Sequence, residues 1–303
     1  MKPCSVLFLT GPTGSGKTSI SLKLAAKLDA EIINADVGQF YQPLCVGTAK
    51  PNWKKQTIKH HLFDVLTEPK DLNVAAYRTM VLETLESLWV QGKLPIVVGG
   101  SLFYIKSLLF PASEFSGPVR RRLCEGGWEK LYSIDPERAS SIDPKDEYRI
   151  NRALAIWEQT GKKPFEFKPK FDPGFNAKIV FIDLPRDILF DRINKRTEEM
   201  IKTLGWVDEV RGLRGTSWEE FLKRKKLIGY PEIFDFLDRG AKQEDLPVLI
   251  TLIQQKTRQY AKRQVTFWKK LRTLLECEGQ AESKTQIITD ATELLKEGRR
   301  VFL

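Results

Sequence analysis

A glycine-rich segment near the start of the chain has the residues of a phosphate-binding loop. Residues 11–18 read GPTGSGKT, which is the complete pattern GxxxxGK[ST]. Glycines let successive backbone amides converge on a phosphate, Lys17 adds a full positive charge, and the Thr18 hydroxyl can ligate Mg²⁺. An ordinary glycine-rich turn is the alternative, but an apolar run precedes the segment and a helical pattern follows it. We therefore predict a site for a diphosphate or triphosphate on Gly11, Pro12, Thr13, Gly14, Ser15, Gly16, Lys17 and Thr18.

Two more polar segments follow apolar runs and are expected at the same edge of a sheet. Asp36 lies in NADVGQFYQ, and Gly99-Gly100-Ser101 ends the run that begins at residue 95. Ligands of open α/β sheets bind at the carboxyl ends of the strands. Asp36 could hold magnesium, act as a general base, or cap a turn. The segment with Ser101 could contact the same phosphate or form an ordinary strand-to-helix turn.

Basic residues recur at helical spacing in the second half of the chain. Arg192 and Arg196 are four residues apart, and such a pair could neutralise charge on a leaving phosphate or form a solvated helix face. A longer basic stripe consists of Arg258, Lys262, Thr266 and Lys269. A stripe of this kind suits a helix that packs on the protein and faces a polyanion, although its charges could also serve only solubility.

The apolar pattern predicts the elements that would position these residues. Continuous apolar runs occupy residues 5–10, 31–36, 95–100 and 177–184, and helical patterns occupy 19–28, 74–93 and 186–205. Buried strands that alternate with helices indicate a parallel sheet covered on both faces. The expected fold class is therefore α/β, with a P-loop NTPase-like parallel sheet flanked by helices.

The fourth apolar run resumes the sheet late in the chain, which indicates an insertion. Residues 111–176 lack a buried-strand pattern and contain a clear helix over 146–161, so we predict a small helical insertion there. The discontinuous core then comprises residues 1–110 and 177–275, and its last part reads as one long helix from about residue 244. Residues 276–303 form a mostly polar tail in which we find no chemistry.

Composition narrows the class of protein. The 303 residues carry 49 Lys+Arg against 39 Asp+Glu, a net charge of +10, which favours a phosphate-bearing partner. No apolar run approaches the roughly 20 residues that span a bilayer, so no membrane partner is expected. The four scattered cysteines support neither a disulfide framework nor a zinc site, and we expect a reducing cytoplasm. The adjacent His60 and His61 are interpreted as structural or substrate-contacting residues.

Several of these segments together resemble the bacterial tRNA dimethylallyltransferases. GPTGSGKT is similar to that family's GPTASGKT loop, NADVGQFYQ to its aspartate-serine-x-glutamine-x-tyrosine segment, and VGTAKP to its IGTAKP. HHLFDVL, LPIVVGGSLFYIKSLL, DEYRINRALAIWEQTGK, RINKR, IGYPEI and TRQYAKRQVTF follow in the family's order, to about residue 270. Two departures are Val37, where the family has serine, and Ser101-Leu102-Phe103, where it has threonine-glycine-leucine.

The resemblance implies transfer of a dimethylallyl group from dimethylallyl diphosphate to the exocyclic amine of the adenosine 3′ of the anticodon in tRNA. Lys17, Thr18 with Mg²⁺ and Arg196 would stabilise the leaving diphosphate, and Asp36 would take the proton. The 111–176 insertion would contact the anticodon stem-loop, while the helix with the basic stripe would bind tRNA and not touch the donor. The implied tRNA-binding residues are Asp36, Val37, Gly38, Gln39, Ser101, Arg122, Tyr148, Arg149, Ile150, Asn151, Arg152, Arg258, Lys262, Arg263, Gln264 and Thr266.

Two rival functions share part of this pattern. A kinase or an isopentenyltransferase acting on free adenine nucleotide would need the phosphate loop and Asp36, but not the basic helix. The second rival is a non-enzymatic RNA-binding protein whose nucleotide site is regulatory or decayed, and the departures Val37 and Leu102 favour it. The phosphate loop also matches ATP-binding proteins, and we expect the chain to act as a monomer.

Overall fold

The computed structural model describes residues 4–111, 126–167, 169–279 and 285–288. The chain divides into a core unit, Met1–Leu109 with Pro173–Leu303, and an insertion unit, Phe110–Asp172. The insertion unit corresponds to the segment that the sequence sets apart at 111–176. Arg122, an expected tRNA contact, lies outside the described residues.

The core unit is built on a parallel sheet, as predicted. Its strands, in spatial order, are β3 (His60–His61), β2 (Ala30–Asn34), β4 (Leu94–Gly99), β1 (Ser5–Thr10), β5 (Asn176–Ile182) and β6 (Thr285–Ile288). The four central strands coincide with the four apolar runs. The two edge strands were not predicted, and β6 places part of the 276–303 segment in the sheet instead of in a separate tail.

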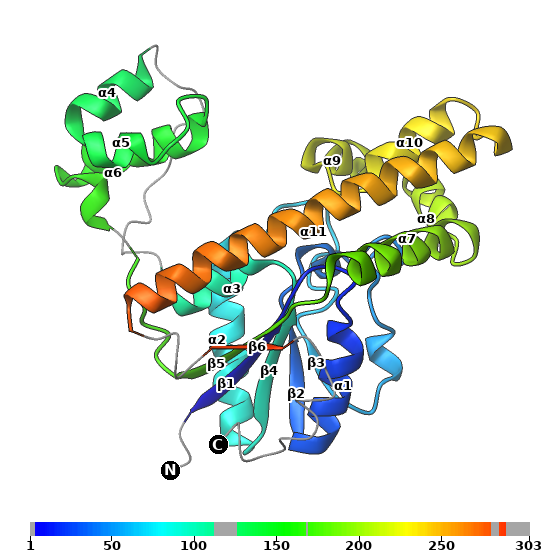
Figure 1. Ribbon diagram of the computed structural model, residues 1–303, viewed down its shortest axis with the longest axis horizontal. Helices are drawn as coiled ribbons and strands as arrows, with labels where there is room; N and C mark the ends of the chain where they lie inside the picture. Colours follow the sequence, from blue (N-terminus) through cyan, green and yellow to red (C-terminus); the bar gives the residue numbers. More distant parts are fainter. Residues whose placement is uncertain (1–3, 112–125, 168, 280–284, 289–303) are drawn as a thin grey trace. The chain divides into compact units, whose positions relative to one another are not determined.

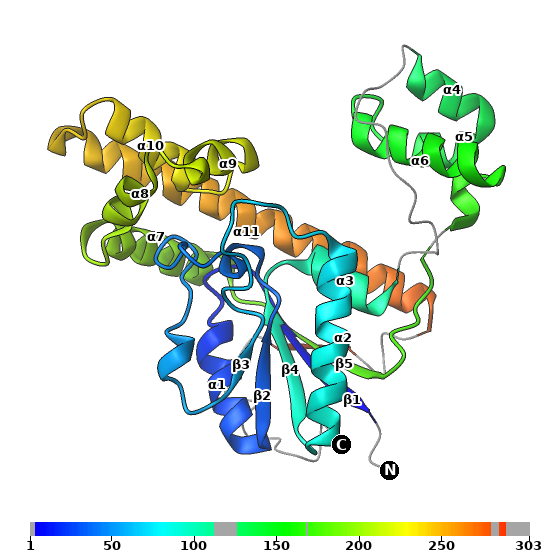
Figure 2. The same ribbon diagram turned by 180° about the vertical axis from the view of Figure 1, so that it is seen from behind.

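Helices cover both faces of this sheet (Figures 1 and 2). On one face, α1 (Lys17–Leu28) packs Leu24 and Leu28 against Leu7 and Leu9 of β1. On the other face lie α2 (Val74–Val90) and α3 (Leu102–Leu109). Strand residues alternate between the two layers, so nearly every β1 and β5 position is buried.

A group of helices follows β5 in the sequence. It comprises α7 (Arg186–Lys202), α8 (Trp206–Leu213), α9 (Ser217–Lys225), α10 (Tyr230–Asp238) and α11 (Leu246–Cys277). The long helix α11 is the one expected from about residue 244, with Pro247 in its first turn. Both views place it beside α7, and Trp268 of α11 stacks on Phe181 of β5 at 4.6 Å between ring centroids.

Short 3₁₀ segments connect several of these elements. They are η1 (Val37–Phe40), η2 (Trp53–Lys55), η3 (Pro164–Phe167) and η4 (Gln243–Asp245). Within the residues that the structure describes, no helix is both long and apolar enough to cross a membrane.

The insertion unit has its own small core. It contains α4 (Gly127–Ile134), α5 (Pro136–Ser140) and α6 (Glu147–Thr160). The buried Asp135 follows α4 and joins α5 to η3, because its carboxylate accepts hydrogen bonds from the backbone of Arg138 in α5 and of Phe165 in η3. The apolar core is formed by Leu131, Ala139, Ile142, Ile150, Ala153 and Leu154.

Candidate active site

The phosphate loop joins β1 to α1 with the geometry that its sequence predicts. Gly16 precedes the helix with φ 89°, a left-handed conformation that favours glycine. The Lys17 side chain folds back over the loop, where its Nζ donates to the carbonyl oxygens of Gly11 and Pro12 at 2.9 Å each. Burial lowers the pKa of Lys17 to about 8, against an opposing effect of Asp36. The helix N-terminus and this ammonium together favour an anion.

Asp36 follows the carboxyl end of β2, where it caps η1 and also lines a cavity. Its Oδ1 accepts a hydrogen bond from the Gly38 backbone at 3.2 Å, so it caps η1 as one interpretation of the sequence proposed. It also lines a cavity, as a base would have to. Burial raises the pKa of Asp36, while Lys17, the Gly38 and Gly100 amides and Arg196 oppose that rise. A carboxylate with a raised pKa beside two cations is suited to accepting a proton.

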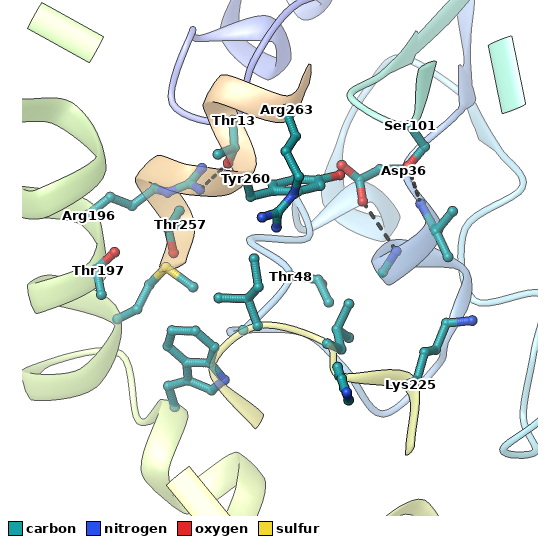
Figure 3. Close-up of a pocket in the computed structure, with 18 residues that line it drawn as sticks. Thr13, Asp36, Thr48, Ser101, Arg196, Thr197, Lys225, Thr257, Tyr260 and Arg263 are labelled. Atoms are coloured by element: carbon teal, nitrogen blue, oxygen red, sulfur yellow. Dashed lines mark hydrogen bonds between the residues drawn. The ribbon is translucent and has the colours of Figure 1, made fainter. Parts of the chain in front are cut away.

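Arg196 of α7 reaches the phosphate loop. Its Nη2 donates to the Thr13 hydroxyl at 2.6 Å, and Figure 3 shows this contact at the edge of the cavity. Burial lowers the pKa of Arg196, and Asp36 raises it in opposition. Arg192 lies one turn earlier, and a side chain at Gly16 would come within 3.8 Å of its Nη1. Arg196 therefore faces the loop, whereas Arg192 is exposed to solvent.

A cavity of about 340 Å³ opens between these residues and the helices that follow β5. Figure 3 shows Asp36, Arg196 and Tyr260 around one opening, with Thr48 and Lys225 across from them. The cavity is polar where the loop and Asp36 meet and becomes apolar toward α8. Its lining residues are Thr13, Asp36, Val37, Gly38, Gly47, Thr48, Ser101, Arg196, Thr197, Met200, Trp206, Lys225, Lys226, Leu227, Ile228, Thr257, Tyr260 and Arg263.

The wall formed by Gly47 and Thr48 is fixed by a carboxylate from α8. Glu209 accepts hydrogen bonds from the backbone amides of residues 45, 46 and 47 at 2.8, 2.6 and 3.1 Å, and from the Tyr230 hydroxyl at 2.8 Å. Successive amides that converge on one anion form a rigid concavity. A side chain at Gly47 would collide with Trp206, so this close approach requires glycine.

Four of the expected tRNA-binding residues line the same cavity: Asp36, Val37 and Gly38 after β2, and Ser101 after β4. Val37 and Gly38 line the cavity, and the Val37 amide donates to the Ser101 hydroxyl at 3.0 Å. The valine that departs from the family pattern therefore keeps a backbone contact across to β4. Gln39 instead donates its side-chain amide to the Thr48 carbonyl at 3.1 Å, which ties the cavity wall to η1.

Helix α11 contributes directly to the cavity. Tyr260 and Arg263 line it together with Asp36 and Arg196. The sequence did not lead us to expect α11 residues beside Asp36 and Arg196. That this helix binds tRNA and does not touch the donor stays a prediction. Burial raises the pKa of Tyr260, and Asp36 adds to that rise.

The other α11 residues divide between packing and solvent. The Arg258 guanidinium donates to Asn194 of α7 at 2.6 Å, and both Arg258 and Lys262 lie over the Phe190 ring. Lys262 and Thr266 are exposed. Gln264, expected at the tRNA, is 5% exposed and bonds within the protein, so we assign it to the interior instead.

Of the α6 residues expected to bind tRNA, some are exposed and others are buried. Tyr148 is 72% exposed, and Arg149 is exposed with an ion pair to Asp146. Ile150 belongs to the core of the insertion unit and Asn151 is 7% exposed. The side chain of Ile150 is fully buried, so we assign it to packing and not to RNA.

Sequence reasoning missed the apolar side of the cavity. Met200, Trp206 and Ile228 come from α7, α8 and the loop after α9. No motif marks Met200 or Trp206, whereas Ile228 is the first residue of IGYPEI, a segment that resembles the family pattern.

Thr18 could hold Mg²⁺ if a diphosphate is bound. Its hydroxyl lies on the first turn of α1 beside Lys17 and is exposed, and Mg²⁺ is often held by one or two protein oxygens together with phosphate oxygens. Among the residues that the structure describes, His, Cys, Asp and Glu side chains form no cluster of three or more that would bind a metal alone. The donor set therefore fits a cation shared with a phosphate group.

Comparisons with known proteins agree on one family. The family model described as IPP transferase matches residues 39–271. A protein of Alkaliphilus oremlandii described as tRNA dimethylallyltransferase is 34% identical over 300 residues, which cover 91% of this chain and 95% of that protein. A solved eukaryotic dimethylallyltransferase acting on tRNA matches with a TM-score of 0.76 and 26% identity, over 95% of this chain and 75% of that one. The full-length tRNA isopentenylpyrophosphate transferase from Bacillus halodurans matches with a TM-score of 0.66 and 25% identity, over 97% and 93% of the two chains.

Proposed function

The chain belongs to the IPP transferase family, and from this premise we propose that it transfers a dimethylallyl group to tRNA. The donor is dimethylallyl diphosphate, the acceptor is the exocyclic amine of the adenosine 3′ of the anticodon, and diphosphate is released. The chain acts as a monomer.

One observation carries this proposal. Thr13 of the phosphate loop, Arg196, Asp36 and residues of helix α11 all border one cavity. A group transfer from a diphosphate to a nucleobase needs an anion site, a base and an acceptor surface within reach of each other. Residues that could supply these three features come from distant parts of the chain and line the same cavity, which supports the proposal.

The proposed step breaks the allylic carbon–oxygen bond and forms a carbon–nitrogen bond. The electron pair of the broken bond leaves with diphosphate, where the loop amides, Lys17 and Arg196 stabilise the developing negative charge. The lone pair of the adenine amine forms the new bond, and Asp36 accepts the amine proton. The apolar side of the cavity, near Met200 and Trp206, excludes water from the allylic carbon.

Thr18 is the protein oxygen that would hold Mg²⁺ at the diphosphate. When bound there, the cation supplies positive charge to the leaving group. Lys17 and Arg196 act on the same group from the loop side, so the two protein cations and Thr18 share one function.

We assign tRNA binding to the exposed residues of α11 and of the insertion unit. Lys262→Ala is expected to lower the slope of log affinity against log salt concentration by ~0.7–0.9, because each phosphate contact releases counterions. The measurement is a salt titration of anticodon stem-loop binding, with Lys23→Ala, an exposed lysine of α1, as the control that should retain the wild-type slope. An unchanged slope with a raised Michaelis constant for the donor would move Lys262 to the diphosphate site.

The decisive experiment supplies purified protein with labelled dimethylallyl diphosphate and either tRNA or AMP. We expect label in tRNA and none in AMP, because a free nucleotide cannot use the exposed basic residues of α11. Label in AMP alone would support the rival transferase. Binding of tRNA without label in either acceptor would support a non-enzymatic RNA-binding protein.

A further inference from the structure

A glutamine inside α11 connects two loops of the site. The Oε1 atom of Gln264 accepts the Thr13 backbone amide at 2.9 Å, and its Nε2 donates to the Gly100 carbonyl at 2.8 Å. The residue is 5% exposed, so these bonds form away from competing water. One buried amide group therefore joins the phosphate loop, the turn after β4 and the long helix.

Each partner of Gln264 contacts a group that the reaction uses. Thr13 also receives the Arg196 guanidinium on its hydroxyl. The backbone amide of Gly100 lowers the pKa of Asp36 against the rise caused by burial. Gln264 is therefore hydrogen-bonded both to Thr13, which contacts Arg196, and to Gly100, which lies beside Asp36.

The contact leaves no spare space. A Cβ atom at Gly100 would lie 2.3 Å from the Gln264 Nε2, which is closer than real Cβ contacts permit. Nε2 is the far end of the glutamine side chain, so a methyl group at position 100 would displace the Gln264 amide. The hydrogen bond from Gln264 to the Gly100 carbonyl would then be disturbed.

We propose that Gln264 is a positioning residue that sets the spacing between the phosphate loop and Asp36. The proposal rests on the proposed transfer to tRNA, because only there do the two loops act on one reaction. Gln264 touches neither substrate, and it acts by holding Thr13 and Gly100 in register. Reaction rates are sensitive to such spacing, since a misplacement of about 1 Å can cost ~10²-fold.

The test compares Gln264→Met with Gln254→Met. Gln254 lies on the same helix and also donates its side-chain amide to a backbone carbonyl, that of Asn194 in α7, but has no contact with the site loops. We expect the single-turnover rate constant with saturating substrates to fall ~10–10²-fold in Gln264→Met and to stay within about twofold in Gln254→Met. Affinity for the anticodon stem-loop should be unchanged in both. A purely structural role would lower the reacting fraction and leave the rate constant unaltered.

Two further measurements keep the outcome decisive. Gly100→Ala displaces Gln264 from the opposite side and should lower the same rate constant if Gln264→Met does not fold. Inorganic diphosphate should bind Gln264→Met about fivefold more weakly, because the phosphate loop loses the hydrogen bond that holds its Thr13 amide in place. Wild-type protein that binds diphosphate but does not prenylate tRNA would refute the proposed function. In that case, the diphosphate affinity of Gln264→Met would still test whether Gln264 positions the phosphate loop. A rate constant and a diphosphate affinity within twofold of wild type in Gln264→Met would overturn the positioning role.

Discussion

Asp36→Asn is expected to slow the chemical step by ~10²–10⁴-fold while tRNA binding persists. Asparagine preserves the shape of the side chain and an oxygen that can accept the Gly38 amide, so η1 keeps its cap. It removes the basicity that the transfer needs. The measurement is the single-turnover rate with saturating donor and tRNA, together with the dissociation constant for the anticodon stem-loop.

The pH dependence separates the base from the cap. Burial raises the pKa of Asp36, so its carboxylate is protonated at a higher pH than an ordinary aspartate, and the wild-type rate should fall as pH decreases through that raised pKa. Asp36→Asn should lack this acidic limb. Asp36→Ala loses both the basic carboxylate and the hydrogen bond from the Gly38 amide, so its difference from Asp36→Asn measures the contribution of the cap. A rate for Asp36→Asn near that of wild type would leave Asp36 with only its structural role.

The central strands of the sheet could be predicted from the sequence, because burial on both faces requires apolar residues there. Central strands are covered on both faces, so β1, β2, β4 and β5 appear as continuous apolar runs. The edge strands carry a weaker pattern: β3 consists of two histidines, and β6 contains two polar residues followed by two isoleucines. Backbone pairing with a single neighbour places them, and side-chain composition does not reveal such pairing. His61 is instead engaged by the buried Glu31 of β2, at 2.7 Å between Nε2 and Oε2.

Part of the candidate site is likewise encoded in consecutive residues, and part depends on contacts between residues far apart in the sequence. The phosphate loop is predictable because its function lies in eight consecutive residues. Gln264 meets Thr13 across 251 residues of sequence, and no local pattern distinguishes a buried glutamine from an exposed one on a basic helix. Arg263, which the resemblance placed among the tRNA-binding residues, lines the cavity, and no local pattern shows this either. Periodicity identifies helix faces, but only packing decides what each face meets.

Lys17→Ala is expected to lower turnover by ~10²-fold or more, the loss typical of removing one preorganised charge at a leaving group. Its Nζ already lies over the loop on the carbonyl oxygens of Gly11 and Pro12, so little rearrangement is needed when an anion arrives. Turnover is measured at saturating tRNA and donor. Lys23→Ala removes an exposed lysine from the same helix and should retain wild-type turnover.

The pKa of Lys17 gives this prediction a second readout. Because burial lowers that pKa to about 8, the free protein loses the Lys17 proton as pH rises through 8, and affinity for inorganic diphosphate should weaken over that range. Lys17→Ala should bind diphosphate weakly at every pH and show no such transition, whereas Lys23→Ala should keep it. Turnover of Lys17→Ala equal to wild type, with the transition still present, would mean that another group carries the charge at the leaving diphosphate.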